Sequence, residues 1–327
     1  FKRHEKLGTR YIHLDTSDTN NAFAIALRTI PQDSTGVAHI LEHTTLCGSK
    51  RYPVKDPFFH MLKRSLNTFM NAMTSADWTC YPFSTQNEQD YDNLLNVYVD
   101  SVFFPELKEL DFRQEGHRLE LITKRMKEDI DNDNKILLER KGVVYNEMKG
   151  KMSDPSDLFA MHTDKNVFSD TIYQHNFGGD PEVIPQLTHK QLKEFHAKYY
   201  HPSNAVFYSY GDLQPCLRQL HELVLSKFSP LDSLRDIDDS ITLQPYYESP
   251  VKHIACEGPP DAFLGEPDRQ TRMCMTWLCN RVDDVEDTIG LMVLSQLLLN
   301  GPNAPFYQQM IATGMGYSFT TNTDVIQ

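Results

Sequence analysis

Large and small apolar residues alternate near the start of the chain. From Ala22 to Ile30, the large side chains of Phe23, Ile25 and Leu27 alternate with alanines, and an earlier apolar run covers Tyr11 to Leu14. A period of two residues is the pattern of a β-strand in which one face packs better than the other. The sequence therefore predicts two strands in this part of the chain.

Later segments repeat apolar residues at intervals of three and four, which is the spacing of a helix with one buried face. The clearest stripe follows Asn87, a candidate N-cap, and consists of Tyr91, Leu94, Leu95, Tyr98 and Val102. Pro57 predicts the start of another helix, because proline is favoured at the first helical position. Thr188 and Gln191 form a capping box that predicts a third. Such stripes are typical of core packing.

Between the first two of these helices lie two segments with strand character. Residues 68–74 (TFMNAMT) and 77–84 (DWTCYPFS) flank a short turn at Ser75 and Ala76. Two such runs joined by a short turn predict an antiparallel pair. Strands and helices thus occur in mixed order, which indicates an α+β domain.

A second domain is predicted towards the C-terminus. Residues 231–250 are rich in Asp, Ser and Pro, and we expect them to link a catalytic domain, 1–230, to a partial second domain, 251–327. The second part repeats the order of the first, with a strand at 272–278, an apolar helix at 287–300, a helix opened by Pro305 and a strand at 316–322. No HxxEH motif accompanies this repeat, so we expect it to be non-catalytic.

The composition narrows the class of protein. The 327 residues are 40% apolar and 24% charged, as in soluble globular proteins, and the formal charge of -13 argues against a nucleic-acid surface. The sequence has no apolar run long enough to cross a membrane, so we expect neither nucleic acid nor membrane as a partner. The six cysteines form no CxxC pair, which favours free thiols, and a targeting peptide would have been removed or lie outside this sequence.

The stretch GVAHILEHTTLC contains the strongest chemical signal of the chain. Its HxxEH arrangement places His39 and His43 four residues apart, so on a helix both imidazoles can reach one metal ion. Glu42 lies beside the pair, where a carboxylate can stay off the metal and take a proton from a water that the metal activates. The spacing is the inverse of HExxH. The alternative is an amphipathic helix whose histidines are merely solvated or hydrogen-bonded.

Several further segments carry a resemblance to a known family. The segments HILEH, TLCGS, DPF, LNTFMNAMT, YPFSTQN, RQEGHRLE, GVVYNEMKG, GGDP and HPSNA closely resemble those of the pitrilysin metallopeptidases. The resemblance implies an α+β fold with a mixed, largely antiparallel sheet packed by helices. It also implies that His39 and His43 bind Zn²⁺ and that Glu42 is the general base.

The resemblance adds residues that the sequence pattern alone would not select. Glu147, in NEMKG, would by itself be an ordinary surface glutamate, but it matches the distal zinc ligand of the family. Asn71 and Ala72 match the edge strand on which such enzymes bind peptides through main-chain hydrogen bonds. Some pitrilysins carry another acid seven positions before the distal ligand; that position is Arg140 here, so the carboxylate that would orient a histidine ligand is unassigned.

The function that the resemblance implies is zinc-dependent endoproteolysis of unfolded peptides, such as cleaved targeting peptides, in the mitochondrial matrix. Family members are built from two halves, so we expect a C-terminal half of the same protein to complete the active site. Residues 1–327 alone should then be almost inactive. Two alternatives remain open: a processing peptidase with the same chemistry, and a catalytically inactive assembly subunit with the same fold, which intact motif residues disfavour.

Overall fold

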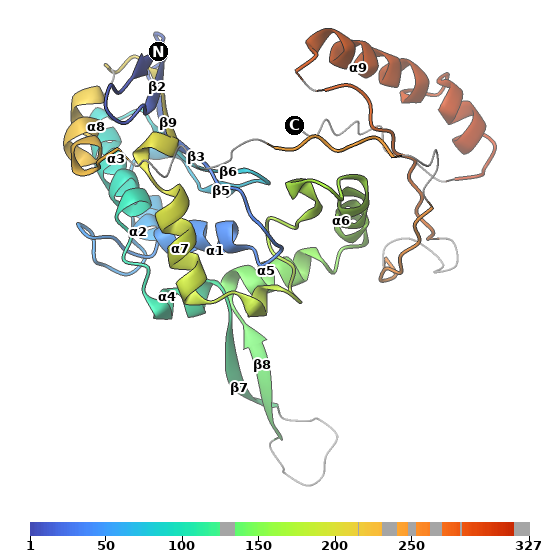
Figure 1. The fold of residues 1–327 in the computed structure, drawn as a ribbon, viewed down its shortest axis with the longest axis horizontal. Helices are drawn as coiled ribbons and strands as arrows, with labels where there is room; N and C mark the ends of the chain where they lie inside the picture. Colours follow the sequence, from blue (N-terminus) through green and yellow to red (C-terminus); the bar gives the residue numbers. More distant parts are fainter. Residues whose placement is uncertain are drawn as a thin grey trace. The chain divides into compact units, whose positions relative to one another are not determined.

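The computed structural model describes residues 1–124, 135–214, 216–230, 241–247, 253–261, 270–281 and 283–316 of the chain (Figure 1). These residues belong to two compact units, Phe1–Arg272 and Met273–Gln327. The predicted linker lies inside the first unit and only residues 241–247 of it are described. The division into a catalytic domain, a linker and a second copy therefore stays a prediction.

A mixed seven-stranded sheet lies at the centre of the first unit (Figure 1). Its strands are β1 (Lys2–Arg3), β2 (Arg10–Asp15), β3 (Asn21–Arg28), β4 (Asn67–Met70), β5 (Met73–Thr74), β6 (Trp78–Thr85) and β9 (Ala205–Gly211). The order is β1-β2-β9-β3-β6-β4, with β5 also paired to β6. Strands β2 and β9 run parallel and the other described pairs of this sheet are antiparallel, which confirms the predicted fold class.

The central strand β3 shows why the apolar alternation is informative. It pairs with β6 along its whole length and with β9 on its other side. Phe23, Ile25 and Leu27 are completely or almost completely buried, whereas the intervening alanines are only half-buried. One face of the sheet therefore carries the core and the other is more open, as the pattern predicts.

Helices cover the face of the sheet that carries the large side chains. The first unit contains α1 (Val37–Thr45), α2 (Pro57–Arg64), α3 (Glu88–Phe103), α4 (Glu109–Glu115), α5 (Val143–Lys151), α6 (Pro155–Val167), α7 (His189–Tyr199) and α8 (Leu217–Leu223). The predicted stripe of α3 is buried, and its Tyr91 and Tyr98 rings contact Phe83 of β6. Helix α1 lies beside α7 and α4, and its Thr45 contacts the hydroxyl of Tyr81 on β6.

The predicted helix starts are confirmed where a side chain makes the cap. The Asn87 side chain accepts a hydrogen bond from the backbone N–H of Asp90, at 2.9 Å, and Thr188 with Gln191 forms the full capping box of α7. Pro57 occupies the first turn of α2. These caps satisfy N–H groups that have no partner within their own helix.

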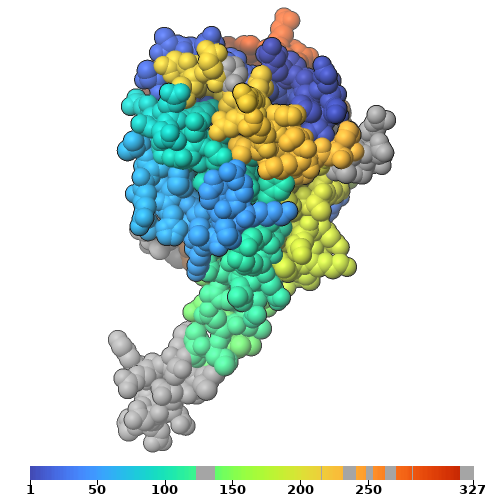
Figure 2. Space-filling model, turned by 90° about the vertical axis from the view of Figure 1, so that its left-hand side faces the viewer, coloured from blue at the N-terminus to red at the C-terminus, as the bar shows by residue number. Residues whose placement is uncertain are grey.

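A two-stranded hairpin, β7 (Arg118–Lys124) and β8 (Lys135–Lys141), projects from the first unit (Figure 1, Figure 2). These two strands were not predicted from the sequence, and the polar segment between them lies outside the described residues. The base of the hairpin joins α4 to α5, so it connects two elements that reach the motif helix.

The second unit contains α9 (Val285–Leu299) and a π-helical turn, η7 (Tyr307–Ile311). Helix α9 confirms the predicted apolar helix. The predicted strand at 272–278 is wrong, because this segment has irregular backbone, and most of the one at 316–322 lies outside the described residues. Within the described ranges, no helix combines the length and the apolar character needed to cross a bilayer.

Candidate metal centre

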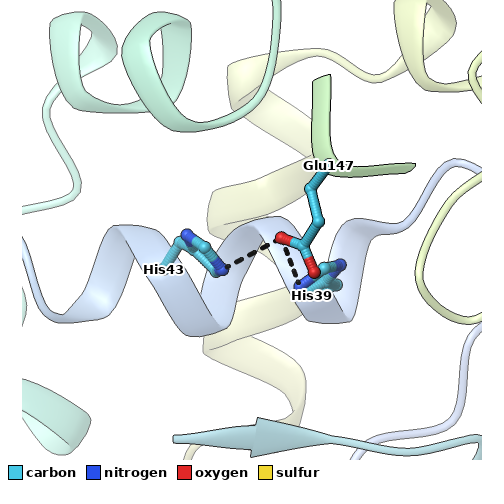
Figure 3. A group of neighbouring side chains, drawn as sticks. All are labelled: His39, His43 and Glu147. Carbon is cyan, nitrogen blue, oxygen red and sulfur yellow. Dashed lines mark ion pairs between the residues drawn. The ribbon is translucent and has the colours of Figure 1, made fainter. Parts of the chain in front are cut away.

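Helix α1 presents the motif residues on the side that faces α5 (Figure 3). Ala38, Ile40 and Leu41 are fully buried, so the packing of α1 fixes its rotation. His39 and His43 are only partly buried, and their ring centroids lie 5.0 Å apart. The helical spacing thus brings the two imidazoles side by side, as the sequence predicts.

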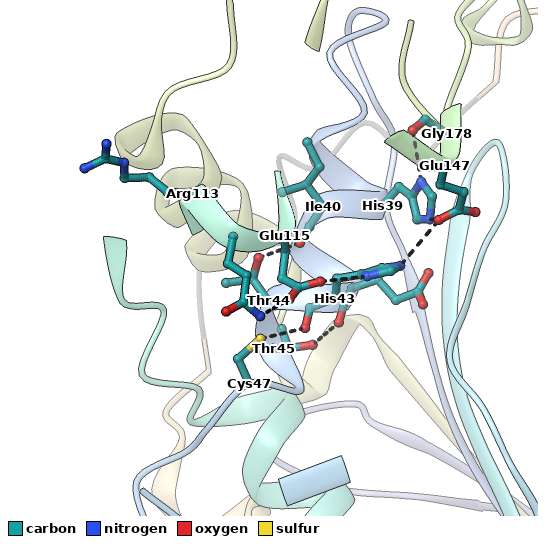
Figure 4. Close-up of polar contacts among 12 residues, drawn as sticks. His39, Ile40, His43, Thr44, Thr45, Cys47, Arg113, Glu115, Glu147 and Gly178 are labelled. Atoms are coloured by element: carbon teal, nitrogen blue, oxygen red, sulfur yellow. Dashed lines mark hydrogen bonds and ion pairs between the residues drawn. The ribbon is translucent and has the colours of Figure 1, made fainter. Parts of the chain in front are cut away.

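A close backbone approach holds His39. Helix α1 starts from Gly36, whose φ of 68° lies in the left-handed region, and a Cβ there would come within 2.8 Å of the carbonyl oxygen of Gly178. Glycine is therefore required by both conformation and space. The approach lets that carbonyl accept a hydrogen bond from His39 Nδ1, at 2.9 Å (Figure 4). Because a carbonyl only accepts, Nδ1 carries the hydrogen and Nε2 presents its lone pair.

His43 is held in the same way, but by an acid. Its Nδ1 lies 3.1 Å from Oε2 of Glu115, the last residue of α4 (Figure 4). The other oxygen of Glu115 accepts a hydrogen bond from Gln114, at 2.9 Å. No sequence pattern assigns this carboxylate, although Glu115 lies in the segment RQEGHRLE, which resembles the family. Arg140, where some relatives carry an acid, instead donates to His117.

Glu147 reaches the two histidines from α5 (Figure 3). Its Oε2 lies 3.7 Å from Nε2 of His39 and 4.0 Å from Nε2 of His43. One ligand atom from each of the three residues lies within 4.8 Å of the others. The structure therefore brings together the three predicted ligands, which come from two helices far apart in sequence; their binding of zinc stays a prediction.

The donor set fits a zinc ion. Ligand atoms about 2.0–2.2 Å from a tetrahedral zinc lie about 3.3–3.6 Å from one another, close to the separations between Glu147 and the histidines. Both Nδ1 atoms are engaged elsewhere, so both Nε2 atoms are free to bind. The Glu147 side chain is 51% exposed, which leaves the site open to water. A catalytic zinc site of this type has two imidazoles and one carboxylate as protein ligands and a fourth position open to water.

Glu42 lies next to this group and is itself buried, with 6% of its surface exposed. Its Oε2 accepts a hydrogen bond from the Thr74 hydroxyl, at 2.5 Å. Burial raises the pKa of the Glu42 carboxyl, and the charge of Glu147 adds to the rise, while Thr74 and the two histidines act against it. A carboxyl with a raised pKa accepts and returns protons more readily near neutral pH.

The acidic surroundings also act on His43. Burial lowers the pKa of its imidazole, but the hydrogen bond to Glu115 and the charges of Glu42, Glu115 and Glu147 outweigh that effect, so the pKa is raised. Without a metal, the site therefore attracts a proton. A bound divalent cation would meet the same negative surroundings.

Asn71 and Ala72 lie between β4 and β5, at the edge of the sheet, and not within a strand. The backbone N–H of Asn71 donates to the carbonyl of Pro82 on β6, and its carbonyl accepts from the Tyr98 hydroxyl. The N–H of Ala72 is bonded to the Asn71 side chain. This segment adjoins Thr74 and hence Glu42, and its predicted role in binding peptides stays a prediction.

Comparison with known proteins assigns the family. The family model described as Insulinase (Peptidase family M16) matches residues 28–142, and the one described as Peptidase M16 inactive domain matches residues 186–325. Over 97% of the chain, the sequence is 48% identical to the mitochondrial presequence protease of Mus musculus. The chain belongs to peptidase family M16. The resemblance to the pitrilysin metallopeptidases is thereby confirmed.

Other M16 relatives agree with this assignment. The mitochondrial presequence proteases of Xenopus laevis and Drosophila melanogaster are 46% and 45% identical over 98% of the chain. The chain spans about 30% of the length of each of these relatives. What the complete proteins do therefore involves much sequence beyond the residues present here.

Solved structures support the M16 fold. A protease from Helicobacter pylori gives a TM-score of 0.57 at 20% identity, over 95% of this chain and 67% of that one. The ferredoxin protease FusC gives a TM-score of 0.54 at 18% identity, over 70% of this chain and 24% of that one. At such identities the likeness concerns the fold alone.

Proposed function

We propose that this chain forms the zinc-binding part of a metalloendopeptidase that degrades unfolded peptides, such as cleaved presequences in the mitochondrial matrix. The observation that supports it most is the convergence of His39, His43 and Glu147 beside the buried Glu42. The relatives are mitochondrial presequence proteases by name, which supports the choice of substrate and compartment. The donor set supports zinc as the metal.

The residues of the chain divide the chemistry between them. His39, His43 and Glu147 hold the zinc, which supplies Lewis-acid activation of water and of the scissile carbonyl. Glu42 takes a proton from the attacking water and returns it to the leaving amine. The Thr74 hydroxyl fixes one oxygen of Glu42, which keeps the carboxylate in place between the two transfers.

The sheet edge that carries Asn71 and Ala72 provides a place for the peptide. A substrate that adds to this edge as a further strand would be held mainly by main-chain hydrogen bonds, which depend little on its sequence. Its backbone would lie near Thr74 and therefore near Glu42. The proposal also requires a C-terminal half of the same protein to complete the active site. The chain spans about 30% of the length of its relatives, which supports this requirement.

Two substitutions separate the roles of the acids. Glu42→Gln should retain zinc and lower peptide turnover by about 10²–10⁴-fold, because a general base is removed while the ligands remain. Glu147→Gln should lower the zinc content, because a ligand charge is lost. Zinc is measured by metal analysis of the chain itself, and turnover in the chain joined to its C-terminal half.

A matched control is Glu194→Gln, which changes an exposed acid on α7 and should alter neither zinc content nor turnover. Normal zinc content in Glu147→Gln would show that this residue is not a ligand. Full turnover in Glu42→Gln would remove it as the base. Zinc binding without any hydrolysis by the complete protein would favour an inactive subunit.

A further inference from the structure

Glu115 of α4 contacts His43 but takes no part in the chemistry proposed above. The contact differs from those that several other described histidines make. His117, His189 and His196 each direct Nε2 towards a backbone carbonyl, which is an ordinary way to satisfy a partly buried imidazole. His43 instead directs Nδ1 towards a buried carboxylate, that of Glu115. Burying a carboxylate is costly without a strong partner, so this contact calls for a role.

We propose that Glu115 is a positioning residue for the metal: its carboxylate fixes the tautomer and the ring orientation of His43 and thereby strengthens zinc binding. The inference rests on the proposed zinc site. Because the carboxylate accepts the hydrogen from Nδ1, the lone pair of His43 stays on Nε2, the atom that lies 4.0 Å from Glu147. Carboxylate partners of this kind also make an imidazole a better ligand.

The local fold places Glu115 against α1 and limits its freedom. Gly116 directly follows α4, and a Cβ there would come within 3.1 Å of Ile40 on α1, so the missing side chain lets the two helices approach. Phe112, one turn earlier, is buried and anchors the helix. The side chain of Glu115 is only 10% exposed, so the carboxylate is held where it meets His43.

The two oxygens of Glu115 each meet a hydrogen-bond donor. Oε2 accepts from His43, and Oε1 accepts from the amide of Gln114. A glutamine at position 115 has the same shape but only one acceptor oxygen, so its NH₂ group would face one of the two donors. Glu115→Gln is therefore expected to disturb the orientation of His43 while leaving the packing of α4 nearly unchanged.

The test measures the zinc affinity of the chain by competition with a chelator of known affinity. We expect Glu115→Gln to weaken zinc binding by about 10-fold and Glu115→Ala by about 10–100-fold, the usual cost of losing such a partner. Glu109→Gln, which changes an exposed acid at the start of the same helix, is the matched control and should bind zinc like the original chain.

A second readout needs no metal. In ¹⁵N-correlated NMR spectra of the metal-free chain at a pH where His43 is neutral, its hydrogen should reside on Nδ1, and Glu115→Gln should mix the two tautomers. Zinc affinity within twofold of the original chain in Glu115→Gln would overturn the inference, as would an unchanged tautomer. If the original chain itself fails to bind zinc, the proposed zinc site fails instead, so the two failures are distinguishable.

Discussion

Neutral hydroxyl groups lie directly beneath the motif helix. The Thr45 hydroxyl donates to the backbone carbonyl of Glu42 and contacts the Tyr81 hydroxyl at 3.2 Å, and Tyr81 contacts Tyr200 at 2.8 Å. Burial holds the pKa of both tyrosines above the usual range, so they remain uncharged. The core side of α1 therefore supplies hydrogen bonds without charge, and the charged groups that act on Glu42 lie on the side that faces α5.

His196, which is not among the predicted site residues, should govern part of the dependence of stability on acid pH. His196 on α7 donates from Nε2 to the carbonyl of Val102, and its ring stacks on Tyr200. Burial lowers its pKa from 6.5 to about 4. His196 therefore binds a proton near pH 6.5 in the unfolded chain but only near pH 4 in the folded chain. Its contribution to the unfolding free energy is fully present above pH 6.5 and is lost as the pH falls from 6.5 towards 4.

The expected loss from this residue between pH 7 and pH 5 is about 2 kcal/mol of unfolding free energy. Urea unfolding at the two pH values measures it. His196→Gln keeps a donor for the Val102 carbonyl but does not titrate. Its unfolding free energy should therefore fall by about 2 kcal/mol less between pH 7 and pH 5 than that of the original chain. His221→Gln, an exposed position on α8, serves as the control. An identical pH dependence in His196→Gln and the original chain would refute the assignment.

At the scale of the elements, glycines allow backbone segments to come close together, and these contacts set the positions of the helices that carry the site residues. Gly142 precedes α5, and a Cβ on it would lie 1.9 Å from the carbonyl oxygen of Gly116, at the end of α4. The base of the hairpin is thus closed by two glycines in contact. Since α4 carries Glu115 and α5 carries Glu147, this contact positions both acids relative to α1.

Gly142→Ala should therefore damage both stability and the metal centre. The added methyl group meets backbone and not a movable side chain, so we expect a loss of at least about 2 kcal/mol in unfolding free energy. The displacement of α5 should also weaken zinc binding. Denaturant unfolding and chelator competition measure the two effects on the same samples.

Gly150→Ala is the matched control, because Gly150 lies on α5, the helix that Gly142 precedes, and a Cβ there meets no atom within 4 Å. Alanine in a helix is favoured over glycine, so this change should be neutral or stabilising by up to about 1 kcal/mol. Equal effects of the two substitutions would show that the close approach is not what limits position 142.

The elements that the sequence predicts are those whose signal is local. The alternation of β3, the stripe of α3 and the capping box of α7 each arise within one segment, and the structure has each of them. The hairpin of β7 and β8 was missed because its leucines lie exposed among charged residues, without a buried face to set a clear period. The strand expected at 272–278 is wrong because an apolar run does not by itself supply a pairing partner.

In the candidate site too, residues with a local sequence signal could be predicted, whereas residues whose role depends on tertiary packing could not. The spacing of His39, Glu42 and His43 is contained in one helix and could be recognised directly. Glu147 required the family resemblance, because nothing local distinguishes it from a surface acid. Glu115 was missed because its contact with His43 exists only once α4 packs on α1, and no pattern in either segment encodes that pairing.

For the whole molecule, a metal at this site would act as a cross-link. His39 and His43 lie on α1 and Glu147 lies on α5. Along the chain, α2, the strands β4 to β6, α3, α4 and the hairpin separate these two helices. An ion that binds only the folded arrangement adds its binding free energy to that of folding. At a free zinc concentration 100 times the dissociation constant, this contribution is about 2.7 kcal/mol.

Removal of zinc with a chelator should therefore lower the melting temperature by about 4–5 °C, because an unfolding entropy of about 2.1 cal/mol/K per residue makes one kcal/mol worth about 1.5–1.8 °C in a chain of this size. The unfolded chain, with 13 histidines and 6 cysteines, binds some zinc and reduces the shift. Glu147→Gln retains all of these residues, so its unfolded state binds zinc equally, and comparison with it isolates the folded site. Calorimetric scans should show a chelator-dependent shift in the original chain and in Glu42→Gln, but little in Glu147→Gln. Equal shifts in all three chains would mean that the metal binds at a site other than His39, His43 and Glu147.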